Sequence, residues 1–134
     1  MATTGMNGLH HIGLRTVDLE KTLPFYTDTL GFDMTKRVAL PSSDGGNTQI
    51  AFVKLGSLVI EIIQPGDPAS VERQAGMIQH IAIDVEDIEQ VVARLKNKGV
   101  AFRTDEVQGN NELGSRLIFF DGPAGETLEL FEDN

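Results

Sequence analysis

The chain has 134 residues and a formal net charge of -9, and its length suits a single domain that can bury its own core. The acidic balance argues against nucleic acid as a partner, because neutralising phosphates requires a basic face. Cysteine is absent, which excludes disulfides, thiolate metal sites and a cysteine nucleophile. No apolar stretch reaches the ~18 residues of a membrane span and no signal peptide is recognisable, so we expect a cytoplasmic protein with no membrane partner.

The first half of the chain predicts one helix among four strands. After a flexible N-terminus at 1–8, the predicted elements are a strand at 9–16, a helix at 19–30, a strand at 32–40, a loop at 41–47, and strands at 48–55 and 57–64 that form a hairpin. Asp18 is placed to cap the helix and Gly31 to end it. Pro24 lies beyond the first helical turn and should bend the axis, because proline has no amide hydrogen to donate.

The second half predicts the same order of elements after a linker at 65–77 that is rich in proline and glycine. Its predicted elements are a strand at 78–85, a helix that Asp87 caps and Gly99 ends, a short strand at 100–104, a loop at 105–114, and strands at 115–120 and 127–132. We therefore expect an α+β fold in which one domain, at 9–134, contains two tandem βαβββ modules. The modules span about 9–64 and 78–132, and their mixed sheets should each be covered by a helix or by the other half.

A histidine and a glutamate recur at matching places in the two halves. His11 and Glu61 lie on the first and last strands of the first half, and His80 and Glu129 take the same places about 70 residues later. Each glutamate interrupts an apolar run, where an unpaired carboxylate would be very costly to bury unless a cation met it. A single histidine or glutamate in a strand is usually an ordinary structural residue, but the recurrence of the pair in register favours a metal site.

The four side chains predict the kind of ion. Two imidazole nitrogens and two carboxylate oxygens suit a divalent transition metal such as nickel, cobalt, zinc, iron or manganese. Four ligands leave two positions of an octahedral ion for waters or for two vicinal oxygens of a substrate. No phosphate loop, dinucleotide motif or nucleophile elbow in the chain offers a competing chemistry.

At these residues the chain resembles the vicinal oxygen chelate superfamily, which includes glyoxalase I, methylmalonyl-CoA epimerase, extradiol dioxygenases and fosfomycin resistance proteins. The matching segments are His11-Ile12-Gly13-Leu14-Arg15, Phe25-Tyr26-Thr27-Asp28-Thr29-Leu30-Gly31-Phe32, Val59-Ile60-Glu61, Gln79-His80-Ile81-Ala82 and residues 121–130. The resemblance covers nearly the whole chain. It implies paired βαβββ modules whose sheets form a cup around a divalent metal, which is the glyoxalase/bleomycin resistance/dioxygenase fold.

Within that superfamily the ligand set most resembles bacterial glyoxalase I, since epimerases tend to carry glutamine where this chain has Glu61. The resemblance implies a metal bound by His11, Glu61, His80 and Glu129, with nickel or cobalt preferred and zinc, iron or manganese as alternatives. It also implies substrate binding by Arg15 and a homodimer in which His11 and Glu61 of one chain meet His80 and Glu129 of the other. The sequence leaves closure of the site within one chain open.

We therefore expect a lactoylglutathione lyase-like enzyme. It would isomerise the hemithioacetal of a 2-oxoaldehyde and a thiol to a 2-hydroxyacyl thioester through an enediolate, as in methylglyoxal detoxification. The near-symmetry of the two carboxylates motivates the hypothesis that Glu129 is the catalytic base, with Glu61 as ligand and second base. The alternatives are an isomerase of the methylmalonyl-CoA epimerase kind, an iron-dependent extradiol dioxygenase, and a small-molecule binder.

The substrate is expected to be a small thiol adduct or an acyl thioester, and its thiol could be glutathione, another thiol or coenzyme A. Basic residues that could hold an anionic tail are Arg15, Arg37, Arg73, Arg103 and Arg116, although all except Arg15 fit solvated surface charges. We expect Phe52, Phe119 and Phe120 to pack in the core, and the alternative is that they line the wall of a substrate pocket.

Overall fold

The computed structural model describes residues 5, 9–42, 46–71, 80–110 and 114–133. Its helices and strands, in chain order, are β1 Ile12–Arg15, α1 Leu19–Pro24, the π-helix η1 Phe25–Leu30, β2 Asp33–Pro41, β3 Asn47–Leu55, β4 Leu58–Gln64, the 3-10 helix η2 Pro68–Ser70, β5 Ile81–Asp84, α2 Ile88–Asn97, β6 Gln108–Asn110, β7 Ser115–Asp121 and β8 Thr127–Asp133. Most of the predicted flexible N-terminus and the later part of the predicted linker lie outside these residues. Across the described ranges, every helix is too short or too polar to cross a bilayer.

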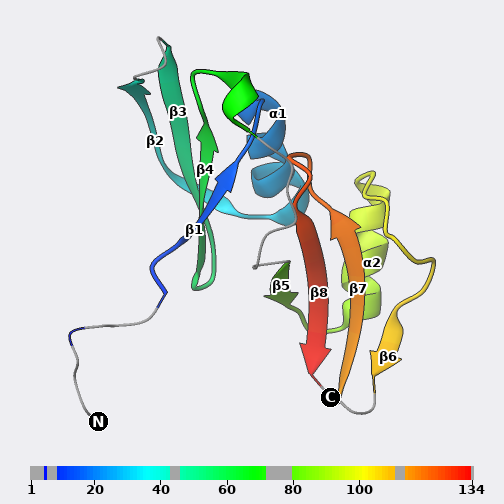
Figure 1. Ribbon diagram of the computed structural model, residues 1–134. Coiled ribbons are helices and arrows are strands. Elements are labelled where there is room, and N and C mark those ends of the chain that lie inside the picture. Colours follow the sequence, from blue (N-terminus) through cyan, green and yellow to red (C-terminus); the bar gives the residue numbers. More distant parts are fainter. Residues whose placement is uncertain (1–4, 6–8, 43–45, 72–79, 111–113, 134) are drawn as a thin grey trace.

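Each module forms its own four-stranded mixed sheet (Figure 1), with strand orders β1-β4-β3-β2 and β5-β8-β7-β6. In both sheets the first strand of the module pairs in parallel with the last, and the other neighbours are antiparallel. The parallel pairing sets Gly13 beside Glu61 in the first sheet and Ala82 beside Glu129 in the second. The repeat in the sequence is therefore a repeat in space, and the predicted α+β fold of two tandem βαβββ modules is confirmed.

The two faces of each sheet differ because strand side chains alternate in direction. On one face of the first sheet Ile60, Ile62 and Val53 are fully buried, and on the corresponding face of the second sheet Ile118 and Leu128 are buried. We call the opposite face of each sheet its open face. Its apolar and acidic members are Val38, Leu40, Ile50, Phe52, Val59, Glu61 and Ile63 in the first sheet and Leu117, Phe119, Glu129 and Phe131 in the second. All of these except Glu129 keep part of their surface exposed.

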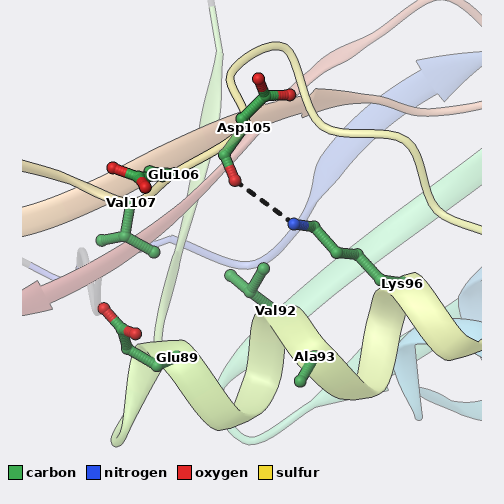
Figure 2. A pocket seen from close by; sticks show the side chains of 7 residues that line it. All are labelled: Glu89, Val92, Ala93, Lys96, Asp105, Glu106 and Val107. Atoms are coloured by element: carbon green, nitrogen blue, oxygen red, sulfur yellow. Dashed lines mark hydrogen bonds between the residues drawn. The ribbon is translucent and has the colours of Figure 1, made fainter.

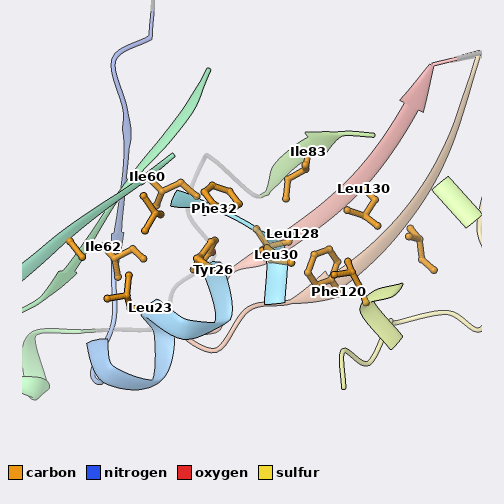
Figure 3. Close-up of a cluster of buried hydrophobic side chains, with 14 of the residues drawn as sticks. Leu23, Tyr26, Leu30, Phe32, Ile60, Ile62, Ile83, Phe120, Leu128 and Leu130 are labelled. Carbon is orange, nitrogen blue, oxygen red and sulfur yellow. The ribbon is translucent and has the colours of Figure 1, made fainter. Parts of the chain in front are cut away.

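One hydrophobic core joins the two modules. The buried cluster in Figure 3 takes Ile60 and Ile62 from the first sheet and Leu128 and Leu130 from the second. The residues of η1 lie between these two groups, and Tyr26 is fully buried among them. Shared burial of apolar surface of this kind stabilises both modules at once, so their relative orientation is part of the folded state.

A hydrogen bond inside this core connects the modules directly. The Tyr26 hydroxyl donates to Glu126 Oε2 at 2.6 Å, and Glu126 Oε1 accepts from the Ala124 amide at 2.9 Å. Glu126 immediately precedes β8, the strand that carries Glu129. Burial raises the pKa of Tyr26, and the neighbouring Glu126 carboxylate raises it further. The protonated hydroxyl is thus the form that the fold requires.

This pair predicts a loss of stability at alkaline pH that depends on Tyr26. A tyrosine ionises near pH 10 when unfolded, so above that pH the unfolded chain releases a proton that the folded chain keeps. The free energy of unfolding should therefore fall by about 1.4 kcal/mol per pH unit from this residue alone. Urea titrations should show wild type more stable than Tyr26→Phe by about 1–3 kcal/mol at pH 8, with the difference shrinking above pH 10. Parallel pH profiles for the two proteins would contradict this assignment.

The predicted helix at 19–30 divides at Pro24, where α1 ends and the wider turns of η1 begin. Proline has no amide hydrogen, so the regular α-helical bond is lost there, and the axis changes at the residue expected to bend it. The ends of the helix agree with the prediction. The Asp18 side chain accepts a hydrogen bond from the Lys21 amide, and Gly31 ends η1 in a left-handed conformation with φ of 89°.

Three details of the second module differ from the prediction. Asp87 occupies the N-cap position of α2, but its side chain makes no capping hydrogen bond and its φ is 51°. The predicted strand at 100–104 is reduced to a single bridge between Phe102 and Phe120. The fourth strand of the sheet is β6, inside the predicted loop at 105–114, because it pairs with β7 although its own residues are polar. Pairing across the sheet outweighs local propensity in so short a strand.

Candidate metal centre

The register of the first sheet brings His11 to Glu61. His11 precedes Gly13 by two residues, so it lies on the same side of the sheet as Gly13 and its parallel neighbour Glu61. His11 Nε2 lies 3.4 Å from Glu61 Oε1, and both side chains are partly exposed. We call this pair the first half-site.

The second sheet repeats this geometry. His80 precedes Ala82 by two residues, and Ala82 is the parallel neighbour of Glu129. His80 Nε2 lies 3.3 Å from Glu129 Oε1, which makes this pair the second half-site. The two glutamates differ in their access to water, since the Glu129 side chain is 6% exposed and the Glu61 side chain is 21% exposed.

The donor atoms of each half-site are spaced as two ligands of one ion would be. Metal–ligand bonds of about 2.1 Å that meet near a right angle place their donor atoms about 3 Å apart. The N···O separations of 3.4 and 3.3 Å are close to that value. Each half-site offers one nitrogen and one carboxylate oxygen, so two half-sites together supply the N₂O₂ set that divalent nickel, cobalt or zinc accepts.

Within one chain the two half-sites stay apart. All four predicted ligands are among the described residues, yet no three His, Cys, Asp or Glu side chains in the described ranges gather closely enough to hold a metal ion. The sequence leaves closure within one chain open, and the fold does not provide it. Each sheet instead presents one histidine–glutamate pair on its open face.

An aromatic ring flanks the histidine of each half-site. Phe52 lies opposite Glu61 in the strand register and meets His11 edge to face, with ring centroids 5.6 Å apart. Phe119 lies opposite Glu129 and meets His80 in the same way at 5.5 Å. These two phenylalanines therefore wall the half-sites and do not belong to the central core, where Phe120 alone of the three is fully buried.

His10, which is not one of the four predicted ligands, contacts the outer nitrogen of His11. The Nδ1 atoms of the two rings lie 2.8 Å apart, so one of them donates and the other accepts. His11 Nε2 is left facing Glu61. A hydrogen bond to the outer nitrogen of a metal-binding histidine fixes its tautomer and orients the ring. Two adjacent histidines before a strand are the only sequence signal for this role.

This contact predicts that His10→Ala lowers nickel affinity about tenfold, because His11 loses the partner that orients it. Isothermal titration with nickel measures the effect directly. Leu9→Ala is the matched control, since Leu9 is the preceding residue and is 76% exposed. Equal nickel affinities for His10→Ala and wild type would remove His10 from the site.

Arg15, the predicted substrate-binding residue, lies at the end of β1. It follows Gly13 by two residues and so belongs to the open face that carries Glu61. The residue is exposed. Its position is compatible with the predicted role, which stays a prediction.

A hollow beside α2 is separate from the half-sites. Figure 2 shows Glu89, Val92, Ala93 and Lys96 of α2 facing the segment of Asp105, Glu106 and Val107. The Lys96 ammonium donates to the Asp105 carbonyl at 3.3 Å across it. None of the four predicted ligands lines this hollow, so we do not assign it to the candidate centre.

Comparison with known proteins places these features in a family. The model of the family described as "Glyoxalase/Bleomycin resistance protein/Dioxygenase superfamily" matches residues 8–130. An uncharacterized protein of Escherichia coli, YaeR, is 32% identical over 130 residues, covering 96% of this chain and 98% of its own length.

Several relatives carry names that describe an activity, and two of them illustrate the range. A probable lactoylglutathione lyase of Synechocystis is 31% identical over 129 residues, covering 92% of this chain and 94% of its own length. The mitochondrial methylmalonyl-CoA epimerase of Mus musculus is 31% identical over 106 residues, covering 75% of this chain and 58% of its own length. Among solved structures, a glyoxalase family protein from Enterococcus faecalis superposes with a TM-score of 0.77 at 25% identity, covering 96% of this chain and 100% of that one.

Proposed function

Because the chain belongs to the glyoxalase/bleomycin resistance protein/dioxygenase superfamily, we propose that it is a metal-dependent lyase of the lactoylglutathione lyase kind. Its substrate is the hemithioacetal that a 2-oxoaldehyde forms with a thiol, and its product is a 2-hydroxyacyl thioester. The observation that carries the proposal is the pair of equivalent half-sites, with N···O separations of 3.4 and 3.3 Å on the open faces of two repeated sheets.

The complete centre forms between two copies of the chain. The first half-site of one protomer meets the second half-site of the other, which unites the four ligands that the fold keeps apart within a chain. A symmetric dimer of this kind contains two such centres. The half-buried apolar side chains of the open faces, such as Ile50, Phe52 and Phe131, support this assembly, because an uncovered apolar sheet face favours association.

His11, Glu61, His80 and Glu129 would hold the metal, for which nickel or cobalt is our first choice and zinc, iron or manganese are alternatives. When bound, a divalent ion supplies Lewis-acid stabilisation of negative charge on two neighbouring substrate oxygens. The protein's share is to keep the four donors in place. The edge contacts of Phe52 and Phe119 restrict rotation of the two histidine rings and keep water from one side of each.

Glu129 moves the proton. Its carboxylate takes the proton from the carbon that bears the sulfur and the hydroxyl, and the released electron pair forms a carbon–carbon double bond as the neighbouring carbonyl becomes an enediolate oxygen. Glu129 returns the proton to that neighbouring carbon while the hydroxyl proton passes to the enediolate oxygen. The sulfur-bearing carbon thereby becomes the thioester carbonyl, and the product is the 2-hydroxyacyl thioester with no net oxidation. The low exposure of Glu129 favours it over Glu61 for this role, because fewer waters compete for the proton. Glu61 is the second carboxylate, and Arg15 is proposed to bind the substrate.

An isomerase of the methylmalonyl-CoA epimerase kind is the second candidate. The similarity to the mouse epimerase favours it, and proton abstraction beside a thioester carbonyl needs the same carboxylate and ion. The presence of Glu61, where such epimerases tend to carry glutamine, places the lyase first. Extradiol dioxygenases typically bind their metal through three protein ligands, and binding proteins of this fold generally lack the metal ligands. Four potential ligands therefore favour the lyase over both of these alternatives.

A nickel titration of metal-free protein tests the proposal. The reaction to follow is conversion of the methylglyoxal–glutathione hemithioacetal to its thioester, and activity should rise until about one nickel is bound per site. Tight nickel binding without turnover would contradict the glutathione-dependent lyase, and methylmalonyl-CoA would then be the substrate to test.

A further inference from the structure

A row of four side chains crosses the open face of the first sheet. His11 and Glu61 form the half-site, Phe52 is the strand neighbour of Glu61, and Lys36 is the neighbour of Phe52 on β2. Directly paired residues in antiparallel strands project to the same face. The adjacent Arg37 projects to the other face, where it pairs with Glu20 of α1.

The second sheet carries the same row. His80 and Glu129 form the half-site, Phe119 is the neighbour of Glu129, and the Arg103 guanidinium lies over the Phe119 ring, 6.0 Å from its centroid. The Arg103 amide also donates to the Phe119 carbonyl, which places its segment beside β7. In both sheets the residues of the row therefore follow the same order across the strands, which is histidine, glutamate, phenylalanine and a basic residue.

The two cations differ in how their charge is balanced. Arg103 forms an ion pair with Asp121 and donates to the Thr127 hydroxyl at 3.1 Å. Lys36 forms no ion pair with any described residue, although the chain as a whole is strongly acidic. A repeated row thus ends in an uncompensated positive charge in one sheet and in a neutral pair in the other.

We propose that Lys36 is the specificity residue that binds an anionic group on the substrate's thiol tail, and that the Arg103–Asp121 pair marks the end of the site that receives the uncharged part. This inference rests on the proposed function and deepens it, because it explains how a nearly symmetric centre accepts an asymmetric substrate in one orientation. The anion is a carboxylate or a phosphate, since both satisfy an ammonium group equally well.

Lys36 is placed to contact the thiol tail of the substrate and lies too far away to contact the atoms that react. Two strand spacings of about 4.8 Å separate its Cα atom from that of Glu61, which gives about 10 Å along the sheet. The exposed Lys36 side chain extends either away from the half-site or back over the Phe52 ring. An anion held there is too far from Glu129 or Glu61 to take part in proton transfer, so Lys36 should act on binding and leave the chemical step unchanged.

Three thioesters with the same lactoyl head and different tails test the inference. They are the lactoyl thioesters of glutathione, of coenzyme A and of N-acetylcysteamine, whose tails carry carboxylates, phosphates and no charge. Their binding to nickel-loaded protein is measured by isothermal titration, so no turnover is needed. Lys36→Gln should weaken binding of at least one anionic thioester about fivefold and leave the neutral one unchanged. The matched control Arg37→Gln removes the neighbouring cation on the opposite face and should change none of the three affinities.

The pattern of losses separates the outcomes. A loss confined to the glutathione thioester identifies a carboxylate tail, and a loss confined to the coenzyme A thioester identifies a phosphate tail. In the Lys36→Gln background, Asp121→Asn frees Arg103 and should restore part of the lost affinity. Equal weakening of all three thioesters, unchanged affinities in Lys36→Gln, or the same loss in Arg37→Gln would overturn the inference. Failure of the proposed function looks different, because the neutral thioester would then not bind while the anionic ones still depended on Lys36.

Discussion

Glu129→Gln should lower turnover of the hemithioacetal by about 10²–10⁴-fold, the contribution expected of a positioned general base. Glutamine keeps the size of the side chain and one oxygen donor, but it cannot accept a proton at neutral pH. Steady-state kinetics on nickel-loaded protein would show the loss in kcat, and nickel titration would establish that the ion is still bound.

Glu132→Gln is the matched control for this experiment. Glu132 lies on the same strand, β8, but projects away from the half-site toward Arg116, 3.9 Å away. It should leave kcat unchanged. Glu61→Gln should lower activity less than Glu129→Gln does if Glu129 is the principal base. Full activity of Glu129→Gln with nickel bound would show that the base is another group.

Mixing two inactive variants should restore activity. His11→Ala removes the first half-site of its chain and His80→Ala removes the second, so each homodimer has two broken centres. In the mixed dimer, one centre combines both defects and the other combines two intact half-sites. Random exchange of equal amounts makes half of the dimers mixed, so activity should return to about a quarter of the wild-type value.

The same experiment separates assembly between chains from closure within one chain. If each chain completed its own centre, every chain in the mixture would still carry a defect, and activity would stay at the level of the separate variants. A control mixture of His11→Ala with Glu61→Ala should remain inactive in both cases, because both changes affect the first half-site.

The two histidine–glutamate pairs could be predicted from the sequence because the repeat supplies the pair twice. His11 and Glu61 alone fit ordinary strand residues, and only the recurrence at His80 and Glu129 distinguishes them. The sequence could not predict that the two pairs stay apart within one chain, since that depends on how the modules pack through Tyr26 and η1.

Other features of the candidate site could not be predicted from the sequence because they depend on the register of strand pairing. Phe52, Phe119 and Lys36 belong to the open faces only because of their pairing partners, and that pairing includes an irregularity between Met34 and Lys36 in β2. A shift of one residue would send each of them to the other face. The break of the first helix at Pro24 was predictable from the chemistry of proline, whereas the short strand β6 was not, because its residues resemble a loop.

The most direct test of the account is a crystal structure of the nickel-loaded protein with diffraction data collected at the nickel absorption edge. We expect two anomalous peaks per dimer, each about 2.0–2.2 Å from His11 and Glu61 of one protomer and from His80 and Glu129 of the other. Nickel held by residues of one chain only, or bound away from these four side chains, would contradict it.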